Sequence, residues 1–393
     1  MDEDSLDTSP NYSGCVIKMG LEELRDEVEK CVGCRVCEEA CTFYSATHDE
    51  KFSPLTKIEI ARKVLNGGRI EDDDIPSIYA CTQCRICERA CPFHLPIADI
   101  VRKMREILVR EKRVPEPIMK LCGNIIEHGS MTGQGVEYWR SWIPKDEEFP
   151  SKAEYLYLVG CMIPFRLHGI GDSTVKIFKK AGLDFTILGE NERCCGLLLY
   201  DHGFIEEAKK TAERNVAKIR ETGARKVVTA CAACYKMYKY VYHELLGDLG
   251  FEVLHVVDVL YSLLEKGVIK PRKRIEAKVA YLDPCHYTKL EGKFSKPRKV
   301  LESIPGLELV ELSRTMELGY CCGLSGGVGM YLRDLPGKAA MKIIEDALEK
   351  GAEKIITSCP LCMYQLSRTI RRNQVEGIEA VDLPIILWES LGE

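Results

Sequence analysis

The sequence of 393 residues lacks several features that mark whole classes of protein. It has no excess of positive charge, because 55 basic residues stand against 60 acidic ones and the net charge is -5. A nucleic-acid-binding role is therefore disfavoured, since such surfaces need clustered Lys and Arg. No apolar run approaches the roughly 20 residues that cross a bilayer. We therefore expect no transmembrane segment.

The start of the chain, MDEDSLDTSPNYSG, lacks the apolar core of a secretory signal and does not fit a mitochondrial import signal. We expect a cytoplasmic protein that could attach to the inner face of the membrane through a partner subunit. Cysteine, in contrast, is abundant, with 20 residues. In a chain without a signal peptide, cysteines are expected to be metal ligands and not a disulfide framework.

Two regularly spaced cysteine runs stand near the start. Residues 31–41 read CVGCRVCEEAC and residues 81–91 read CTQCRICERAC, followed by Pro92. Each is the C-x2-C-x2-C-x3-C run that binds 4Fe-4S clusters, in which the fourth cysteine ligates the other cluster. A pair of zinc sites is the less favoured alternative, because zinc usually takes two separated cysteine pairs. The pattern predicts two cubane clusters, one held by Cys31, Cys34, Cys37 and Cys91 and the other by Cys81, Cys84, Cys87 and Cys41.

The segments beside these runs have a helical period. Apolar residues repeat in PLTKIEIARKVLNGG at Leu55, Ile58, Ala61, Val64 and Leu65, and a similar stripe follows Ile97 in IADIVRKMREILVREKR. We expect a mainly helical domain that carries electrons. The stretch after it, residues 111–152, contains four prolines and the aromatic residues Tyr138, Trp139 and Trp142, which predicts a linker packed against both neighbours. Cys15 and Cys122 belong to no spaced set and are assigned no metal.

The remaining ten cysteines form two equal groups. Matching members lie 124 to 128 residues apart, so the C-terminal part is a duplicated domain. The first group is Cys161, Cys194, Cys195, Cys231 and Cys234, and the second is Cys285, Cys321, Cys322, Cys359 and Cys362. Five cysteines exceed the four that a cubane or a zinc ion needs, so zinc is a minor alternative and a structural disulfide a lesser one.

Short apolar runs lead into these cysteines. YLYLVGC and VAYLDPC end at the first cysteine of each group, and KVVTACAAC and KIITSCPLC contain the C-x2-C pairs. Helical stretches that end at glycines alternate with them, which predicts a parallel α/β unit in each half. Cysteines at the carboxyl ends of parallel strands would gather at one sheet edge, where α/β domains bind ligands. The glycine after each adjacent pair would leave room for close backbone approach.

The pattern C-xn-CCG-xn-C-x2-C resembles the cysteine-rich CCG domain. Two copies behind a two-cluster ferredoxin domain resemble the catalytic subunit of heterodisulfide reductase, an enzyme of methanogenesis, in a form that fuses its ferredoxin and catalytic subunits. The resemblance implies an α+β multidomain protein, with an α-helical ferredoxin domain at 1–110, a linker at 111–152 and CCG domains at 153–270 and 271–393.

The resemblance also implies a function. Each five-cysteine group would hold a noncubane 4Fe-4S cluster, and the disulfide of coenzyme M and coenzyme B would bind between the two clusters and be reduced to two thiols. Protons could come from His286, beside Cys285, or from His202 in YDHG, although either could equally be a packing residue. The electron donor would be a membrane b-type cytochrome or a soluble flavoprotein.

Other interpretations stay open. CCG domains also occur in electron-transfer subunits of flavin-dependent 2-hydroxyacid and glycerol-3-phosphate dehydrogenases, and in membrane complexes that act on a protein-borne disulfide. Both cysteine groups are intact here, which favours disulfide chemistry. A structural scaffold is disfavoured, because ten spaced cysteines exceed what it needs. The glycine-rich GLSGGVG at 323–329 lacks the G-x-G-x-x-G pattern, so we expect it to pack around a cluster and not to bind a nucleotide.

Overall fold

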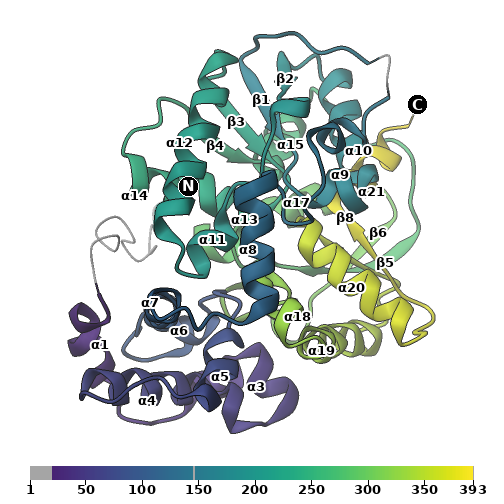
Figure 1. Ribbon diagram of the computed structural model, residues 1–393. Coiled ribbons are helices and arrows are strands. Elements are labelled where there is room, and N and C mark those ends of the chain that lie inside the picture. Colours follow the sequence, from purple (N-terminus) through teal and green to yellow (C-terminus); the bar gives the residue numbers. More distant parts are fainter. Residues whose placement is uncertain (1–19, 145–146, 393) are drawn as a thin grey trace, which may run out of the picture.

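The computed structural model describes residues 20–144 and 147–392. Three regions follow one another along the chain: a helical region, a first α/β half and a second α/β half. Figure 1 shows the N-terminal helices at the lower end of the molecule and the two sheets above and beside them. Cys15 lies outside the described residues. No helix in the described part of the chain has the length and apolarity to cross a membrane.

The N-terminal region is built from short helices around the two cysteine runs. They are η1 (Leu21–Leu24), α1 (Arg25–Glu29), α2 (Val36–Ala40), α3 (Thr42–Thr47), η2 (Glu50–Phe52), α4 (Pro54–Leu65), η3 (Asp72–Asp74), α5 (Ile75–Tyr79), α6 (Ile86–Ala90) and α7 (Ile97–Arg110). Helix α4 begins where Ser53 caps it by accepting a hydrogen bond from the Leu55 N–H at 3.0 Å. The predicted helical character of this region is confirmed.

The stretch predicted to be a linker contains a helix of its own. Helix α8 (Glu116–His128) buries Ile118, Leu121 and Cys122, and η4 (Val136–Arg140) follows it. Its aromatic residues pack on the first half: Tyr138 stacks on Phe165, with ring centroids 4.5 Å apart. In Figure 1, α8 runs between the N-terminal helices and the first half. The segment therefore packs on the first half and is more than a linker. The prolines at positions 115 and 117 obscured its helical pattern in the sequence.

Each α/β half has a four-stranded parallel sheet. The first contains β1 (Tyr155–Leu158), β2 (Phe185–Ile187), β3 (Lys226–Thr229) and β4 (Glu252–His255) in the order β2-β1-β3-β4. The second contains β5 (Ala277–Leu282), β6 (Leu307–Val310), β7 (Lys354–Thr357) and β8 (Glu379–Asp382) in the equivalent order β6-β5-β7-β8. Identical strand orders bear out the duplication that the cysteine spacing predicts.

Helices cover both sheets. In the first half they are α9 (Met162–Arg166), α10 (His168–Lys180), η5 (Gly189–Asn191), α11 (Leu197–Asp201), α12 (Ile205–Glu221), α13 (Ala232–Lys236), the π-helical turn η6 (Met237–Val241), α14 (Tyr242–Leu246) and α15 (Val256–Glu265). In the second they are α16 (Thr288–Glu291), α17 (Ser295–Glu302), η7 (Met316–Leu318), η8 (Ser325–Gly327), α18 (Val328–Tyr331), α19 (Leu335–Glu349), α20 (Pro360–Arg372) and α21 (Leu383–Leu391). Helix α12 shows why these segments are helical, because Ala208, Ala212 and Val216 recur every four residues and form its buried face.

Candidate iron–sulfur and substrate site

The cysteines of the N-terminal region lie in two groups of four. One small cavity is lined by Cys31, Cys34, Cys37 and Cys91, and a second is lined by Cys41, Cys81, Cys84 and Cys87. Each group thus takes three cysteines from one run and the last cysteine from the other. This crossed arrangement is the one that two-cluster ferredoxins use.

The backbone between these cysteines turns in the same way in both runs. Gly33 and Arg35 have φ values of 71° and 65°, and the equivalent Gln83 and Arg85 both have 61°. Non-glycine residues seldom adopt this left-handed conformation, and where they do the surrounding structure holds them in it. The strained turns bring sulfurs that are three residues apart toward one centre, as a cluster requires.

The ten remaining cysteines lie at the carboxyl ends of strands. Cys161 and Cys285 follow β1 and β5 by three residues, and Cys231 and Cys359 follow β3 and β7 by two. The adjacent pairs follow β2 and β6 through short loops. Each sheet therefore brings five thiols to one edge, as ligand positions in parallel α/β sheets predict.

In the first α/β half, each of the five thiols interacts with the next one in a chain of contacts. Cys194 raises the pKa of the Cys161 thiol, and Cys161 and Cys195 together lower the pKa of Cys194. Cys195 in turn interacts with Cys234, and Cys234 with Cys231. These five thiols, called the first set below, are all buried.

The second set repeats this order residue for residue. Cys285 interacts with Cys321, Cys321 with Cys322, Cys322 with Cys362, and Cys362 with Cys359. The Cys322 thiol has a pKa well below its ordinary value, because Cys321 and Cys362 donate to it. The five thiols of each set therefore form a compact group, in which an iron–sulfur cluster would find soft sulfur ligands.

The glycine before Cys161 allows a close approach to the first set. A Cβ at Gly160 would lie 2.8 Å from Sγ of Cys234, so a side chain there would displace the sulfur. Gly196 and Gly323, which follow the adjacent cysteines, have φ values of 85° and 81°. A Cβ at Gly196 would approach Thr211, and one at Gly323 would approach Ala339. These two glycines serve a left-handed turn packed on a helix, and not the close approach to a cluster that the sequence pattern predicts.

Two contacts connect the thiol groups to one another. Cys321 raises the pKa of the Cys84 thiol in the N-terminal region, and the Thr82 hydroxyl lies 3.5 Å from Sγ of Cys321. Cys231 and Cys359, which occupy equivalent positions in the two halves, interact directly. The thiols thus form one series that runs from the N-terminal region to the second set and then to the first.

The glycine-rich loop at 323–329 lies against the N-terminal region. A Cβ at Gly326 would lie 2.8 Å from the Cys81 carbonyl, and one at Gly327 would lie 3.0 Å from Nε2 of His202. Both glycines are left-handed, with φ values of 67° and 63°. The two glycines are needed because the backbone packs closely beside the thiols. This agrees with the prediction, based on the missing nucleotide-binding pattern, that the stretch packs near a cluster.

A cavity of about 260 Å³ opens directly onto the first set. All five of its thiols line the cavity, and none of the second set does. Its other walls come from α8, α9, α11, residues 324–330 and α20, and include Leu121, Phe165, Leu198, Leu361 and Tyr364. This largely apolar cavity would admit an organic substrate to the first set.

The two histidines predicted as proton donors do not line this cavity. Nε2 of His286 lies 3.1 Å from the Gln83 carbonyl, so the ring faces the second cysteine run. His202 is fully buried and stacks on Tyr79 with ring centroids 5.6 Å apart, and neither of its nitrogens has a hydrogen-bond partner. Burial lowers the pKa of both rings well below the ordinary value. Their role as donors stays a prediction.

Glu192 is a buried acid that no sequence pattern singles out. Burial raises its pKa to about 8, and its Oε1 accepts a hydrogen bond from the Gly160 N–H at 2.7 Å. A carboxyl group with this pKa carries a proton near neutral pH. Glu192 is therefore a buried acid close to the first set. In the sequence it follows Glu190 and Asn191 and looks like a surface residue.

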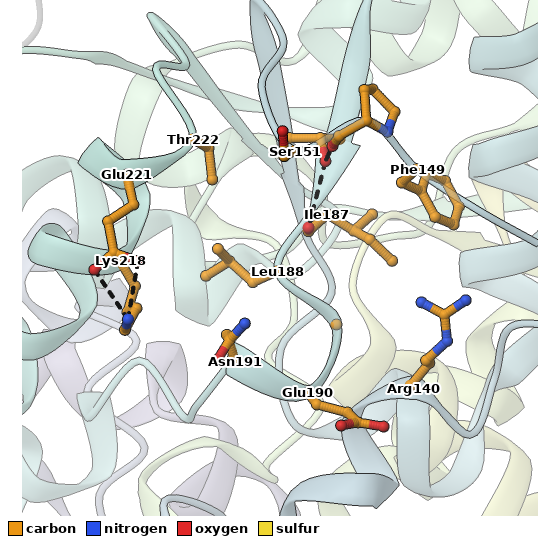
Figure 2. Close-up of a pocket in the computed structure, with 13 residues that line it drawn as sticks. Arg140, Phe149, Ser151, Ile187, Leu188, Glu190, Asn191, Lys218, Glu221 and Thr222 are labelled. Atoms are coloured by element: carbon orange, nitrogen blue, oxygen red, sulfur yellow. Dashed lines mark hydrogen bonds and ion pairs between the residues drawn. The ribbon is translucent and has the colours of Figure 1, made fainter.

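A larger cavity of about 590 Å³ lies away from the cysteines, beside β2 and α12 (Figure 2). Three of its charged side chains already have partners. Lys218 binds Glu221 at 2.9 Å, and Arg140 donates to the Glu147 carbonyl. No residue that the sequence selects for chemistry lines this cavity.

Comparison with known proteins supports this arrangement. A 4Fe-4S dicluster domain matches residues 27–95, and the cysteine-rich CCG domain matches twice, at 155–239 and 279–367. One subunit of the dihydromethanophenazine:CoB–CoM heterodisulfide reductase of Methanosarcina acetivorans is 36% identical over 263 residues, which cover 64% of this chain and 62% of that relative. This chain thus spans somewhat less than two thirds of the relative's length.

More distant similarity extends to other redox proteins. EtfAB:quinone oxidoreductase of Syntrophomonas wolfei is 29% identical over 275 residues, which cover 67% of this chain and 37% of that protein. The structure also resembles that of a hypothetical protein from Helicobacter pylori, with a TM-score of 0.57, 11% identity and coverage of 95% of this chain and 75% of that one. At this identity the second match shows the fold alone.

The domain content, the paired sets of thiols and the sequence similarity agree. The chain joins a 4Fe-4S dicluster domain to two cysteine-rich CCG domains, and over most of its length it is similar to heterodisulfide reductase subunits.

Proposed function

We propose that the protein reduces a small-molecule disulfide to two thiols, and that its substrate is the disulfide of coenzyme M and coenzyme B. The observation that carries the proposal is the series of thiols that runs from Cys84 in the N-terminal region through the second set to the first set, which lines a cavity. The overall reaction adds two electrons and two protons to one disulfide. The S–S bond breaks, and each sulfur leaves as a thiol.

The chain would divide this work among its thiol groups. The two N-terminal groups would hold cubane 4Fe-4S clusters, and the first and second sets would hold one noncubane cluster each. Clusters bound in this way supply electrons one at a time. Gly160 would keep space for the first set by leaving Sγ of Cys234 unobstructed. Leu198, Phe165 and Leu361 would exclude water from the bound disulfide.

Electrons would enter at the group of Cys31, Cys34, Cys37 and Cys91. Cys34 is exposed, and Val32 and Phe93 beside it are 70% and 49% exposed. Large apolar side chains exposed around a redox centre favour docking of a protein donor. We propose that an electron-donating subunit, a b-type cytochrome or a flavoprotein, binds here. A cytochrome partner would also hold the chain at the inner face of the membrane.

The proposal predicts turnover by the protein purified without oxygen. Oxidation of reduced viologen should begin when the coenzyme M/coenzyme B disulfide is added, with symmetric disulfides as comparison substrates. Cys195→Ser should abolish the reaction. Cys122→Ser is the matched control, because Cys122 is buried near Cys194 but stands outside both sets. No turnover by a chain with full iron content would contradict the proposal.

A second function is supported by the similarity to EtfAB:quinone oxidoreductase. In that case the chain would pass electrons between a flavoprotein and a quinone and would reduce no disulfide. The two functions differ in what the cavity beside the first set must do. Only a disulfide reductase requires that filling this cavity stops turnover.

A further inference from the structure

The buried lysines of the described part of the chain differ in whether they have an acidic partner. They are Lys57, Lys103, Lys236 and Lys289. Lys103 binds Glu106 at 3.0 Å, and Nζ of Lys236 lies 3.2 Å from Oδ1 of Asp201. The other two make no ion pair with any described residue. Because a buried charge is costly unless an opposite charge lies nearby, these two lysines indicate an anion that is not an acidic side chain.

Lys57 lines the small cavity of one N-terminal group of thiols. This group, called the inner group below, consists of Cys41, Cys81, Cys84 and Cys87. Nζ of Lys57 donates to the carbonyls of Phe52 and Ser53 at 2.9 and 3.2 Å. The Phe52 carbonyl also accepts from Sγ of Cys41 at 3.8 Å. Lys57 thus shares a hydrogen-bond acceptor with a thiol of the inner group and brings a positive charge beside it.

Lys289 occupies a similar place beside the second set. Its Nζ donates to the carbonyls of Asp283 and Tyr320 at 2.8 and 2.6 Å, and Tyr320 directly precedes Cys321. The carboxylate of Asp283 does not balance Lys289, because its two oxygens accept from Arg298 at 3.1 and 3.0 Å. Lys289 therefore brings an unbalanced positive charge to the second set.

The charges of both lysines act on the neighbouring thiols. Burial raises the pKa of the Cys41 thiol, and Lys57 opposes this shift. In the second set, neighbouring thiols lower the pKa of Cys322, and the charge of Lys289 lowers it further. A positive charge that favours a thiolate also favours any other negative charge at the same place.

An iron–sulfur cluster held by thiolates would supply the missing anion. Reduction adds one further negative charge to such a cluster, and its reduction potential depends on the charges around it. A buried cation favours the reduced form, because its charge is weakly screened in surroundings of low dielectric constant. The first set has no equivalent of Lys289, since Phe165 stands at that position and the charge of Lys236 is balanced by Asp201. The inner group and the second set would therefore be reduced more easily than the first set.

We propose that Lys57 and Lys289 balance the charge of the two middle centres in the series of thiols, so that these centres store the two electrons that one disulfide requires. The two centres adjoin each other where Cys84 interacts with Cys321. Each centre takes one electron from the protein donor. The two electrons and two protons from solvent then convert one disulfide into two thiols at the first set. Neither lysine lines the cavity there, so both are positioning residues that act through the clusters. The use of the stored electrons rests on the proposed disulfide reduction, whereas the charge balance does not.

Redox titration of the iron-loaded protein tests the charge balance. Electron paramagnetic resonance follows each centre, which is identified by the signal that Cys87→Ser or Cys322→Ser removes. Lys289→Gln should lower the equilibrium constant for reduction of the second set about 10-fold, which is about 59 mV for one electron. Lys57→Gln should have the same effect on the inner group. Lys57→Arg and Lys289→Arg should stay within about 2-fold of the wild type, because they keep the charge.

The matched control is Lys103→Gln, because Lys103 is equally buried and Glu106 keeps its ion pair with Arg102 in the variant. Unchanged potentials in both Gln variants, or an equal shift in Lys103→Gln, would overturn the proposal. Loss of iron from a Gln variant that the matching Arg variant retains would support the proposal, because the same charge then acts on cluster binding. Loss of iron from both variants would show a packing role and overturn the assignment of that lysine.

The second test measures the stored electrons. The protein is reduced at a potential at which the two middle centres of the wild type are almost fully reduced, separated from the reductant and mixed with the coenzyme M/coenzyme B disulfide. The double variant Lys57→Gln/Lys289→Gln, reduced at the same potential, should release about half as much thiol as the wild type. Equal yields would overturn the electron store. If the potentials shift as expected but no disulfide is reduced, the proposed function fails and the charge balance stands. If disulfides are reduced but the potentials do not shift, the charge balance fails and the function stands.

Discussion

The two α/β halves share a fold and a thiol pattern, yet their surroundings differ. In the second half, Cys285 is followed after four residues by Lys289, a buried residue whose Nζ donates to the carbonyls of Asp283 and Tyr320 at 2.8 and 2.6 Å. In the first half, the equivalent position after Cys161 holds Phe165, which lines the cavity. At this equivalent position, the second half has a buried cation and the first half has an aromatic side chain.

The segments that pack against the two sets of thiols also differ. Thr42 of the N-terminal region donates to the Cys321 carbonyl at 3.0 Å, and Arg314 donates to the carbonyls of Glu39 and Ala40 at 3.0 and 2.9 Å. The first set is covered instead by the end of α8, where the Gly129 carbonyl accepts from the Cys194 N–H at 2.8 Å. The comparison suggests that duplication gave one site to electron relay and left the other open to substrate.

The strongest challenge to this comparison is the loss of one thiol from each set. Cys195→Ser and Cys322→Ser should each lower the rate of disulfide reduction more than about 1000-fold, and each should lose about one cluster of iron, because a thiolate ligand is removed. Iron analysis and viologen oxidation measure both effects. Loss of iron from Cys122→Ser as well would show that the five-cysteine pattern does not define the site.

Filling the cavity tests whether substrate reaches the first set. Leu198→Trp should lower kcat/KM about 30-fold without loss of iron, because the larger side chain occupies the space for the disulfide. Leu348→Trp is the control, since Leu348 is 37% exposed on α19 and does not line the cavity. Unchanged kinetics in Leu198→Trp would place the substrate elsewhere.

Altering the exposed apolar surface tests where electrons enter. Val32→Asp and Phe93→Asp should slow reduction by a protein donor about 10-fold, because a charge is placed in the docking surface, while reduction by viologen stays unchanged. Stopped-flow absorbance measures both rates. Val268→Asp, at a residue 48% exposed in the first half, should leave both rates unchanged. If it slows the protein donor equally, the docking surface lies elsewhere.

The smallest expected effect is on the pH dependence of stability. It comes from the last residues of two equivalent strands, His255 in β4 and Asp382 in β8. Burial lowers the pKa of His255 to about 3 and raises the pKa of Asp382 well above its ordinary value. His255 stays neutral in the folded chain, whereas the unfolded chain gains a proton below pH 6.5. The contribution of His255 to the free energy of unfolding is therefore complete above pH 6.5. This contribution falls by about 3 kcal/mol between pH 7 and pH 4.

Asp382 acts in the opposite direction. Its stabilisation is complete below pH 3.8 and is lost as the pH rises toward its raised pKa. Thermal denaturation measures both effects. His255→Gln should reduce the decline of the melting temperature at acid pH. Asp382→Asn should raise the melting temperature more at pH 8 than at pH 5. Parallel pH profiles for the two variants would show that these strand ends do not differ as their pKa values indicate.

Local and periodic features of the sequence predicted much of this structure. Cysteine spacing predicted the duplication, and β-branched runs before Cys231 and Cys359 predicted β3 and β7. The crossed groups of four cysteines also agree with the spacing. The position of Cys84 beside Cys321 could not be foreseen, because it depends on how the N-terminal region packs on residues more than 200 positions away in the chain. Helix α8 could not be foreseen for the same reason, because packing over the first set stabilises a helix where the sequence indicates a linker.

The order in which the two sets are reduced tests the central claim most directly. Electrons should be supplied by a protein donor too large to enter the cavity, and each set followed by its electron paramagnetic resonance signal after rapid freezing. The account predicts that Cys195→Ser leaves reduction of the second set at the wild-type rate, whereas Cys322→Ser leaves the first set oxidised. Reduction of the first set at an undiminished rate in Cys322→Ser would contradict the relay through the second half.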